Sequence, residues 1–162
     1  MERLWTPWRY QYVSGTGDSQ GCVFCEAINS EESGRLLLTR GRTCFVILNL
    51  YPYNSGHLMV VPNRHVPCLG ALLPEERVEL MELTCRAECA LNEAYRPQGM
   101  NVGLNLGRSA GAGIVDHLHV HLVPRWTGDT NFMSVVGQVR VLPEELEQTA
   151  ERLRPIFARL SC

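Results

Sequence analysis

Three histidines, His117, His119 and His121, stand at alternate positions of one short apolar segment. Successive side chains of a β-strand point to opposite faces, so a strand here would place all three imidazoles on one face. The apolar residues between them would point the other way, into a core. Three neighbouring imidazoles repel one another when protonated, so such a cluster requires an anion, a metal ion or water.

A glycine-rich loop, residues 107–113, comes just before this segment. Glycine permits backbone conformations that turn several N–H groups to one side, where they form a nest for an anion. Taken alone, the loop is better explained as a plain hairpin connection. Beside three histidines it indicates a phosphate group, because an imidazole nitrogen is a competent nucleophile toward phosphorus and neighbouring N–H groups hold its oxygens.

Cys22 and Cys25 have the spacing of a metal knuckle. A tetrahedral zinc ion would need two further ligands, which histidines can supply. The pair is also consistent with a redox couple or with two unrelated thiols. His57 and His65, on either side of an apolar run that ends at Pro62, are the remaining histidines.

Chemistry alone leaves three hypotheses open. The first is a phosphorus-transfer enzyme whose nucleophile is a strand histidine. The second is a zinc-dependent hydrolase in which His117, His119 and His121 bind a catalytic zinc ion that activates water. The third is a small zinc-stabilised binding module, in which Cys22, Cys25 and two histidines form a structural site.

The rest of the chain provides strands and helices to hold these residues. Apolar runs bounded by turn residues predict strands over residues 34–39, 44–50, 57–62, 100–106 and 117–124. Apolar residues spaced by three and four predict a helix from Pro74 and a final helix from Pro143, which Pro155 should kink or interrupt. Hairpins dominate this pattern, so we expect an α+β fold with an antiparallel sheet flanked by a few helices.

Composition limits the protein to a few broad classes. The chain has 162 residues, a formal net charge of −2 and 45% hydrophobic residues, which is typical of one globular domain. Its near-neutral charge argues against general nucleic-acid binding. Seven unevenly spaced cysteines do not indicate a disulfide framework. No run reaches the length of about 18 apolar residues that spans a membrane, and the aromatic start is unlike a signal peptide, so we expect a cytoplasmic protein with no membrane partner.

The motifs together resemble the histidine triad (HIT) family. The segment HLHVHLV matches the family signature of three histidines alternating with apolar residues, the stretch from Asn49 to His65 matches its second block, and CVFC matches the knuckle of its zinc-bearing branch. The segments RLWTPWR, LNLYPYNSGHLMVVP, NVGLNLG and HLHVHLVPRW resemble, within that branch, those of the bacterial diadenosine tetraphosphate phosphorylases. We expect residues 1–21 to form an aromatic N-terminal arm, residues 22–142 to form the HIT domain and residues 143–162 to form a C-terminal helical segment.

The resemblance also implies a homodimer and a mechanism in two steps. His119 would attack the α-phosphate of a nucleotide and form a covalent nucleotidyl-histidine, which inorganic phosphate or water resolves. His121 and His57 would hold phosphate oxygens, Asn49 would bind ribose hydroxyls and Asn105 would reach the scissile phosphate. The expected ligands of a structural zinc ion are Cys22, Cys25, His65 and His117. The implied substrates are an adenine nucleotide or dinucleoside polyphosphate and inorganic phosphate, giving ADP and ATP from diadenosine tetraphosphate.

One part of the family pattern is altered. Many members carry Gln and Ser four and three residues before the first triad histidine, where this chain has Gly113 and Ile114. We expect the backbone from Gly111 through Ala112 to Gly113, with Ser109, to hold phosphate instead and to leave room for an incoming phosphate ion. Hydrolysis of dinucleoside polyphosphates or of nucleoside phosphoramidates is the alternative function within the family.

Overall fold

The computed structural model describes residues 21–29, 35–129 and 144–160. Nearly all of the predicted aromatic arm lies outside these ranges, so the predicted segment boundaries stay predictions. The described elements, in chain order, are α2 (Val23–Asn29), β1 (Leu37–Arg40), β2 (Cys44–Leu48), β3 (Leu58–Pro62), the 3₁₀ turn η2 (Leu69–Ala71), α3 (Pro74–Tyr95), β4 (Gly99–Gly103), the 3₁₀ turn η3 (Arg108–Ala110), β5 (Val120–Arg125) and α5 (Leu146–Arg159).

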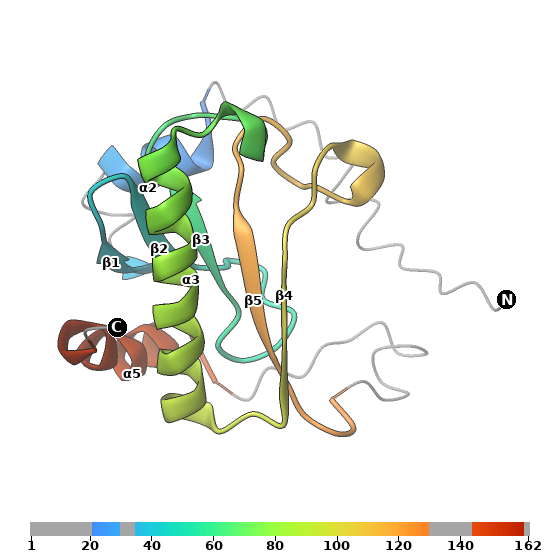
Figure 1. Ribbon diagram of the computed structural model, residues 1–162. Coiled ribbons are helices and arrows are strands. Elements are labelled where there is room, and N and C mark those ends of the chain that lie inside the picture. Colours follow the sequence, from blue (N-terminus) through green and yellow to red (C-terminus); the bar gives the residue numbers. More distant parts are fainter. Residues whose placement is uncertain (1–20, 30–34, 130–143, 161–162) are drawn as a thin grey trace, which may run out of the picture.

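The strands form one antiparallel sheet in the order β1-β2-β3-β5-β4. The long helix α3 crosses one face of this sheet, and α5 packs beside α3 and β1 (Figure 1). The predicted α+β class is therefore confirmed. None of the described helices combines the length and apolar character needed to cross a membrane.

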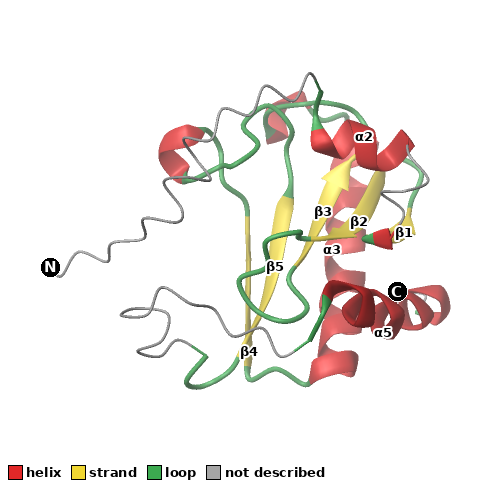
Figure 2. Cartoon of the chain, turned by 180° about the vertical axis from the view of Figure 1, so that it is seen from behind, coloured by secondary structure: helices red, strands yellow, loops and turns green. Residues whose placement is uncertain are grey.

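Side-chain alternation on the central strands builds two separate cores. Val46, Val60 and Leu122 join the large cluster under α3 and α5, whereas Phe45 and Val61 join a smaller cluster with Phe24 of α2. The short helix α2 accordingly lies on the sheet face opposite α3 (Figure 2). Burial on both faces explains why β2 and β3 read as continuous apolar runs rather than as alternating ones.

The helix α3 begins where the sequence predicted. Pro74 stands at the start, and the Glu76 carboxylate accepts the N–H of Leu73 at 2.7 Å. Glu76 also pairs with Arg64, which follows β3, so one carboxylate fixes the helix start to the end of the strand. The final helix α5 continues through Pro155, so the predicted interruption does not occur. Ile156 and Phe157 are buried beside this proline, and their packing offsets the lost backbone hydrogen bond.

The strand that carries the histidines begins later than predicted. We expected it from residue 117, but β5 begins at Val120, opposite Val60 of β3. Two residues beyond Val60, β3 ends at Pro62, which has no N–H to continue the ladder. Residues 117–119 are therefore not paired with β3, and the N–H of Leu118 donates instead to Val66 O at 2.7 Å.

A polar cluster at the far end of β5 anchors the loop that leads into β3. The Asp129 carboxylate accepts from Arg125 and from the side chain of Asn54, at 2.6 Å and 2.8 Å. The same Asn54 amide donates to Pro124 O. Arg125 and the N–H of Trp126 hold the pKa of Asp129 far below its usual value, so this carboxylate stays charged. The loop before His57 is thus tied to the strand that carries His121.

Candidate active site and metal centre

The structure brings four of the five histidines into one row on the α2 face of the sheet. His117 is fully buried, His119 is 5% exposed and His57 is 1% exposed. The rings of His119 and His121 lie 4.8 Å apart, and those of His57 and His121 lie 5.2 Å apart. Although β5 begins only at Val120, the alternation persists, because Leu118, Val120 and Leu122 all lie in the core under α3.

The hydrogen bonds of His119 fix the proton on one nitrogen. Its Nδ1 lies 2.8 Å from the carbonyl oxygen of His117, and a carbonyl oxygen only accepts. Nδ1 therefore carries the proton, and Nε2 carries the lone pair. No described residue hydrogen-bonds to this Nε2. Burial lowers the pKa of His119, which favours the neutral imidazole that a nucleophile requires.

A second chain of hydrogen bonds fixes the protons of His57 and His121. The backbone N–H of Tyr53 donates to His57 Nδ1 at 3.0 Å, so Nε2 of His57 carries its proton. That Nε2 lies 3.0 Å from His121 Nδ1, which must then accept. The proton of His121 is left on Nε2, for which no partner occurs among the described residues. His121 thus offers an outward N–H donor beside the lone pair of His119.

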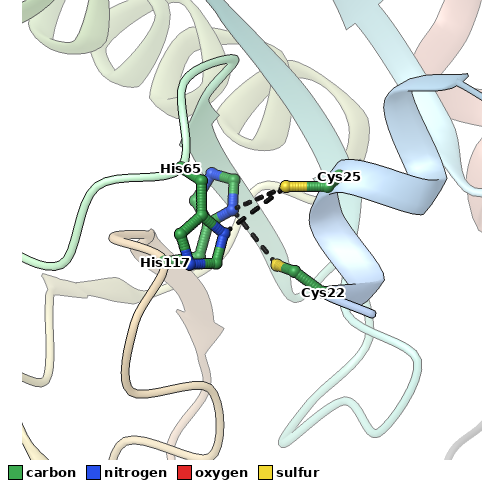
Figure 3. A group of neighbouring side chains, drawn as sticks. All are labelled: Cys22, Cys25, His65 and His117. Atoms are coloured by element: carbon green, nitrogen blue, oxygen red, sulfur yellow. Dashed lines mark hydrogen bonds between the residues drawn. The ribbon is translucent and has the colours of Figure 1, made fainter. Parts of the chain in front are cut away.

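The predicted metal ligands come together from three separate segments. Cys22 and Cys25 at the start of α2 face His65, which follows β3, and His117 (Figure 3). One ligand atom from each residue lies within 4.8 Å of the others. His117 Nε2 donates to Pro62 O at 2.8 Å, so its unprotonated Nδ1 is the atom that faces the two thiols.

The distances in this group fit a tetrahedral zinc ion. Zn–S bonds of about 2.3 Å and Zn–N bonds of about 2.0–2.1 Å would separate the nitrogen and sulfur ligands by about 3.5 Å. The Nδ1 atom of His117 is 3.2 Å from Cys22 Sγ and 3.7 Å from Cys25 Sγ, and His65 Nδ1 is 3.4 Å from Cys25 Sγ. Two thiols and two imidazoles gathered in this way are a ligand set suited to zinc.

Of three other predicted site residues, only Asn49 has a contact with a histidine in the described part of the chain. The side-chain nitrogen of Asn49 lies 3.3 Å from His57 Nε2, and its side-chain oxygen accepts the N–H of Tyr51. Asn105 is half-buried between β4 and η3, and Ser109 is exposed within η3. Neither has a hydrogen bond to the histidines in the described part of the chain.

The predicted phosphate loop adopts the backbone conformations that glycine permits. Gly107 and Gly111 have φ of 82° and 90°, in the left-handed region. The N–H groups of Gly111 and Ala112 donate within the loop, to Arg108 O and Gly107 O, while Ala112 itself is buried. Gly113 is exposed, and its N–H has no partner in the described ranges.

Two aromatic residues near the histidines were missed from the sequence. Phe24 packs against His117 and His119, and the Tyr53 ring lies 4.7 Å from that of His57. Both positions stand inside the motifs themselves, between the two cysteines and four residues before His57. A motif match predicts which polar residues form the site, but it does not predict which apolar residues pack against them.

Imidazoles at alternate positions on one strand face define the histidine triad class of proteins, and the group of two cysteines and two histidines matches its zinc-bearing branch. The HIT domain family profile matches residues 30–128, and the chain belongs to this family. It is 42% identical over 167 residues to AP-4-A phosphorylase of Mycobacterium tuberculosis, spanning 98% of this chain and 86% of that protein. It is 30% identical to bis(5'-adenosyl)-triphosphatase of Dictyostelium discoideum, over 70% of this chain and 79% of that protein.

Solved structures agree with this assignment. A zinc-bound histidine triad family protein from Mycobacterium smegmatis superposes with a TM-score of 0.69 at 30% identity, covering 87% of this chain and 96% of that one. A histidine triad nucleotide-binding protein from Sulfolobus tokodaii gives a TM-score of 0.70 at 28% identity, covering 85% and 92%. The predicted HIT-like fold is confirmed.

The geometry predicts that His121 stays uncharged well below neutral pH. Burial, reinforced by the neighbouring His119, lowers the pKa of His121 to about 4. The unfolded chain takes up this proton near pH 6.5, whereas the folded chain resists it until about pH 4. The free energy of unfolding should therefore fall as pH is lowered from 6.5 toward 4. Nuclear magnetic resonance (NMR) titration of the His121 ring checks this, and a midpoint near 6.5 would contradict it. A His121→Gln variant should show a weaker loss of stability over the same range.

Proposed function

We propose that this HIT-family enzyme transfers a nucleotidyl group from a dinucleoside polyphosphate to inorganic phosphate. The substrate we assign is diadenosine tetraphosphate, and the products are ADP and ATP. The observation that carries the proposal is the state of His119, a buried neutral imidazole whose Nδ1 proton is bound to His117 O. The resemblance to AP-4-A phosphorylase over nearly the whole chain supports the choice of substrate.

In the first step, Nε2 of His119 attacks the α-phosphorus of one adenosine. The N–P bond forms, the bond from phosphorus to the bridging oxygen breaks, and ATP leaves. In the second step, an oxygen of inorganic phosphate attacks the same phosphorus. The N–P bond breaks, ADP leaves, and the lone pair returns to Nε2 of His119. If water replaces phosphate in this step, the product is AMP.

The other imidazoles are assigned to charge and orientation. The Nε2–H of His121 is the donor for a non-bridging oxygen of the transferred phosphate, where negative charge shifts during the reaction. His57 contacts His121 at 3.0 Å, so it orients that donor and acts on phosphate oxygens through it. Asn49, beside His57, is assigned to ribose hydroxyls. Asn105 is assigned to the scissile phosphate. Ser109 and the N–H of Gly113 are assigned to the incoming phosphate, whereas the N–H groups of Gly111 and Ala112 already donate within the loop, contrary to the expectation that they would hold it.

The residues of the Cys/His group fit a structural zinc ion. Cys22, Cys25, His65 and His117 would supply all four ligands, which leaves no open position for substrate or water. Zinc would contribute fold stability by joining α2 to the segment that carries His117. It would also fix the His117 carbonyl, which holds the proton of His119.

The competing hypothesis of a catalytic zinc on the three strand histidines is disfavoured by geometry. Nδ1 of His117 faces the thiols, Nδ1 of His119 faces a backbone carbonyl, and Nδ1 of His121 faces His57. The second nitrogen of His117, Nε2, donates to Pro62 O, so neither nitrogen of His117 is available to a metal ion shared with His119 and His121. Among the described residues, the Cys22, Cys25, His65 and His117 group is the cluster able to hold a metal ion.

Apolar residues left exposed on α3 support the expected homodimer. Val78 and Met81 are 58% and 63% exposed on this helix, and β4 at the edge of the sheet leaves Val102 49% exposed. A second copy would cover both the helix face and the strand edge. Light scattering in solution tests this directly, and a monomeric mass would refute the dimer.

Product analysis tests the proposed reaction. Diadenosine tetraphosphate is incubated with the zinc-loaded protein, with and without inorganic phosphate, and the nucleotides are separated by chromatography. We expect ADP, and ATP beyond the one equivalent per active site released with the first step, to appear only when phosphate is present. AMP and ATP regardless of phosphate would instead identify a hydrolase. Cleavage of AMP-amine substrates with no turnover of the dinucleotide would identify a phosphoramidase.

A pair of histidine variants tests the division between metal and chemistry. His119→Ala should abolish turnover while retaining about one zinc ion per chain and the fold of the wild type. His65→Ala removes a metal ligand and should lose zinc and stability first. Metal analysis and thermal unfolding measure both. Equal loss of zinc in the two variants would contradict the separation of roles.

A further inference from the structure

Phe24 lies between the zinc-ligand group and the histidine row. It stands in the first turn of α2, flanked by Cys22 and Cys25, and its side chain is 2% exposed. Its ring centroid is 5.3 Å from that of His117, edge-on at 76°, and 5.1 Å from that of His119, tilted at 51°. One apolar side chain therefore contacts both a proposed metal ligand and the proposed nucleophile.

The ring of Phe24 limits how the His119 imidazole can turn. His119 makes one hydrogen bond through its ring in the described part of the chain, from Nδ1 to His117 O, and a single bond leaves the ring free to swing about it. Its ring contacts there are with Phe24 and His121. Phe24 supplies the contact from the α2 side, opposite the strand that carries the imidazole. Interiors pack at crystal-like density, so such a contact restricts rotation.

We propose that Phe24 is a positioning residue that holds the His119 imidazole in its reactive orientation and makes that orientation depend on the zinc-bound state of α2. The proposal rests on the proposed function. A metal ion bound by Cys22 and Cys25 fixes the backbone on both sides of Phe24, because all three residues lie within one helical turn. When the metal leaves, this turn loses its anchor to His65 and His117, and the ring no longer restrains His119.

Phe45 provides a matched control. It lies in the same apolar cluster as Phe24, is fully buried and is also a phenylalanine, but it stands on β2. Its ring is not among those that contact His119 in the described part of the chain. Phe24→Leu and Phe45→Leu therefore remove the same ring from the same core, and only the first removes a contact to the nucleophile.

The experiment compares the two zinc-loaded variants with the wild type by three readouts. These are zinc per chain, kcat and KM for phosphorolysis of diadenosine tetraphosphate, and the imidazole ¹⁵N spectrum that reports which nitrogen of His119 carries the proton.

We expect both variants to keep zinc. Phe24→Leu should lower kcat by about tenfold or more with little change in KM, because misorientation of a reacting group is costly. It should also show a mixture of His119 tautomers. Phe45→Leu should retain the kcat and the single Nδ1–H tautomer of the wild type.

Several results would overturn the proposal. One is a Phe24→Leu variant that matches Phe45→Leu in both kcat and tautomer. If Phe24→Leu does not fold, Phe24→Met, which fills the space without a ring, takes its place under the same criteria. Chelation of zinc from the wild type should produce the same tautomer mixture, and a single Nδ1–H tautomer after chelation would refute the link to the metal. A wild type that does not cleave diadenosine tetraphosphate would refute the proposed function instead, while the tautomer comparison would still decide the role of Phe24.

Discussion

The 2.8 Å hydrogen bond from His119 Nδ1 to the carbonyl oxygen of His117 is the constraint on which the site depends. It assigns the proton to one nitrogen and leaves a lone pair on the other, as the proposed role of His119 as nucleophile requires. Its acceptor is itself fixed, because His117 donates through Nε2 to Pro62 O at the end of β3. The position of the proton on His119 is thus set by the backbone carbonyl of His117, which the His117 side chain in turn holds in place.

The same arrangement explains how three histidines share one face without mutual repulsion. His117 turns its Nδ1 toward the thiols of Cys22 and Cys25, and His121 accepts from His57. Burial keeps His119 and His121 uncharged by lowering the pKa of each. Each imidazole has a separate partner. His117 belongs to the Cys/His group, whereas the Nε2 atoms of His119 and His121 have no partner in the described part of the chain.

Much of this site could be predicted from the sequence, because its residues lie in short motifs with strict spacing. The period of two from His117 to His121 predicted a shared face, and the apolar residues between them pack under α3 as expected. The resemblance named His65 and His117 as partners of the two cysteines, and the structure groups those four residues. The hairpin of β1 and β2 and the start of α3 at Pro74 also follow from local turn and helix signals.

What the sequence did not predict depends on contacts between distant segments. The late start of β5 follows from the end of β3 at Pro62, which no local pattern near His117 reveals. The continuation of α5 through Pro155 depends on the core that buries Ile156 and Phe157. The positions of Phe24 against His119 and of Asp129 against Asn54 are likewise tertiary, since each joins residues far apart in the chain.

The most direct measurement is to trap the proposed intermediate and locate it. The zinc-loaded protein is mixed with diadenosine tetraphosphate without inorganic phosphate, quenched rapidly in alkali, and mapped by peptide mass spectrometry. The mechanism predicts an adenylyl group on His119 that forms together with ATP and that added phosphate converts to ADP. An adenylyl group on another residue, or ADP formed from phosphate with no prior adduct on His119, would contradict it.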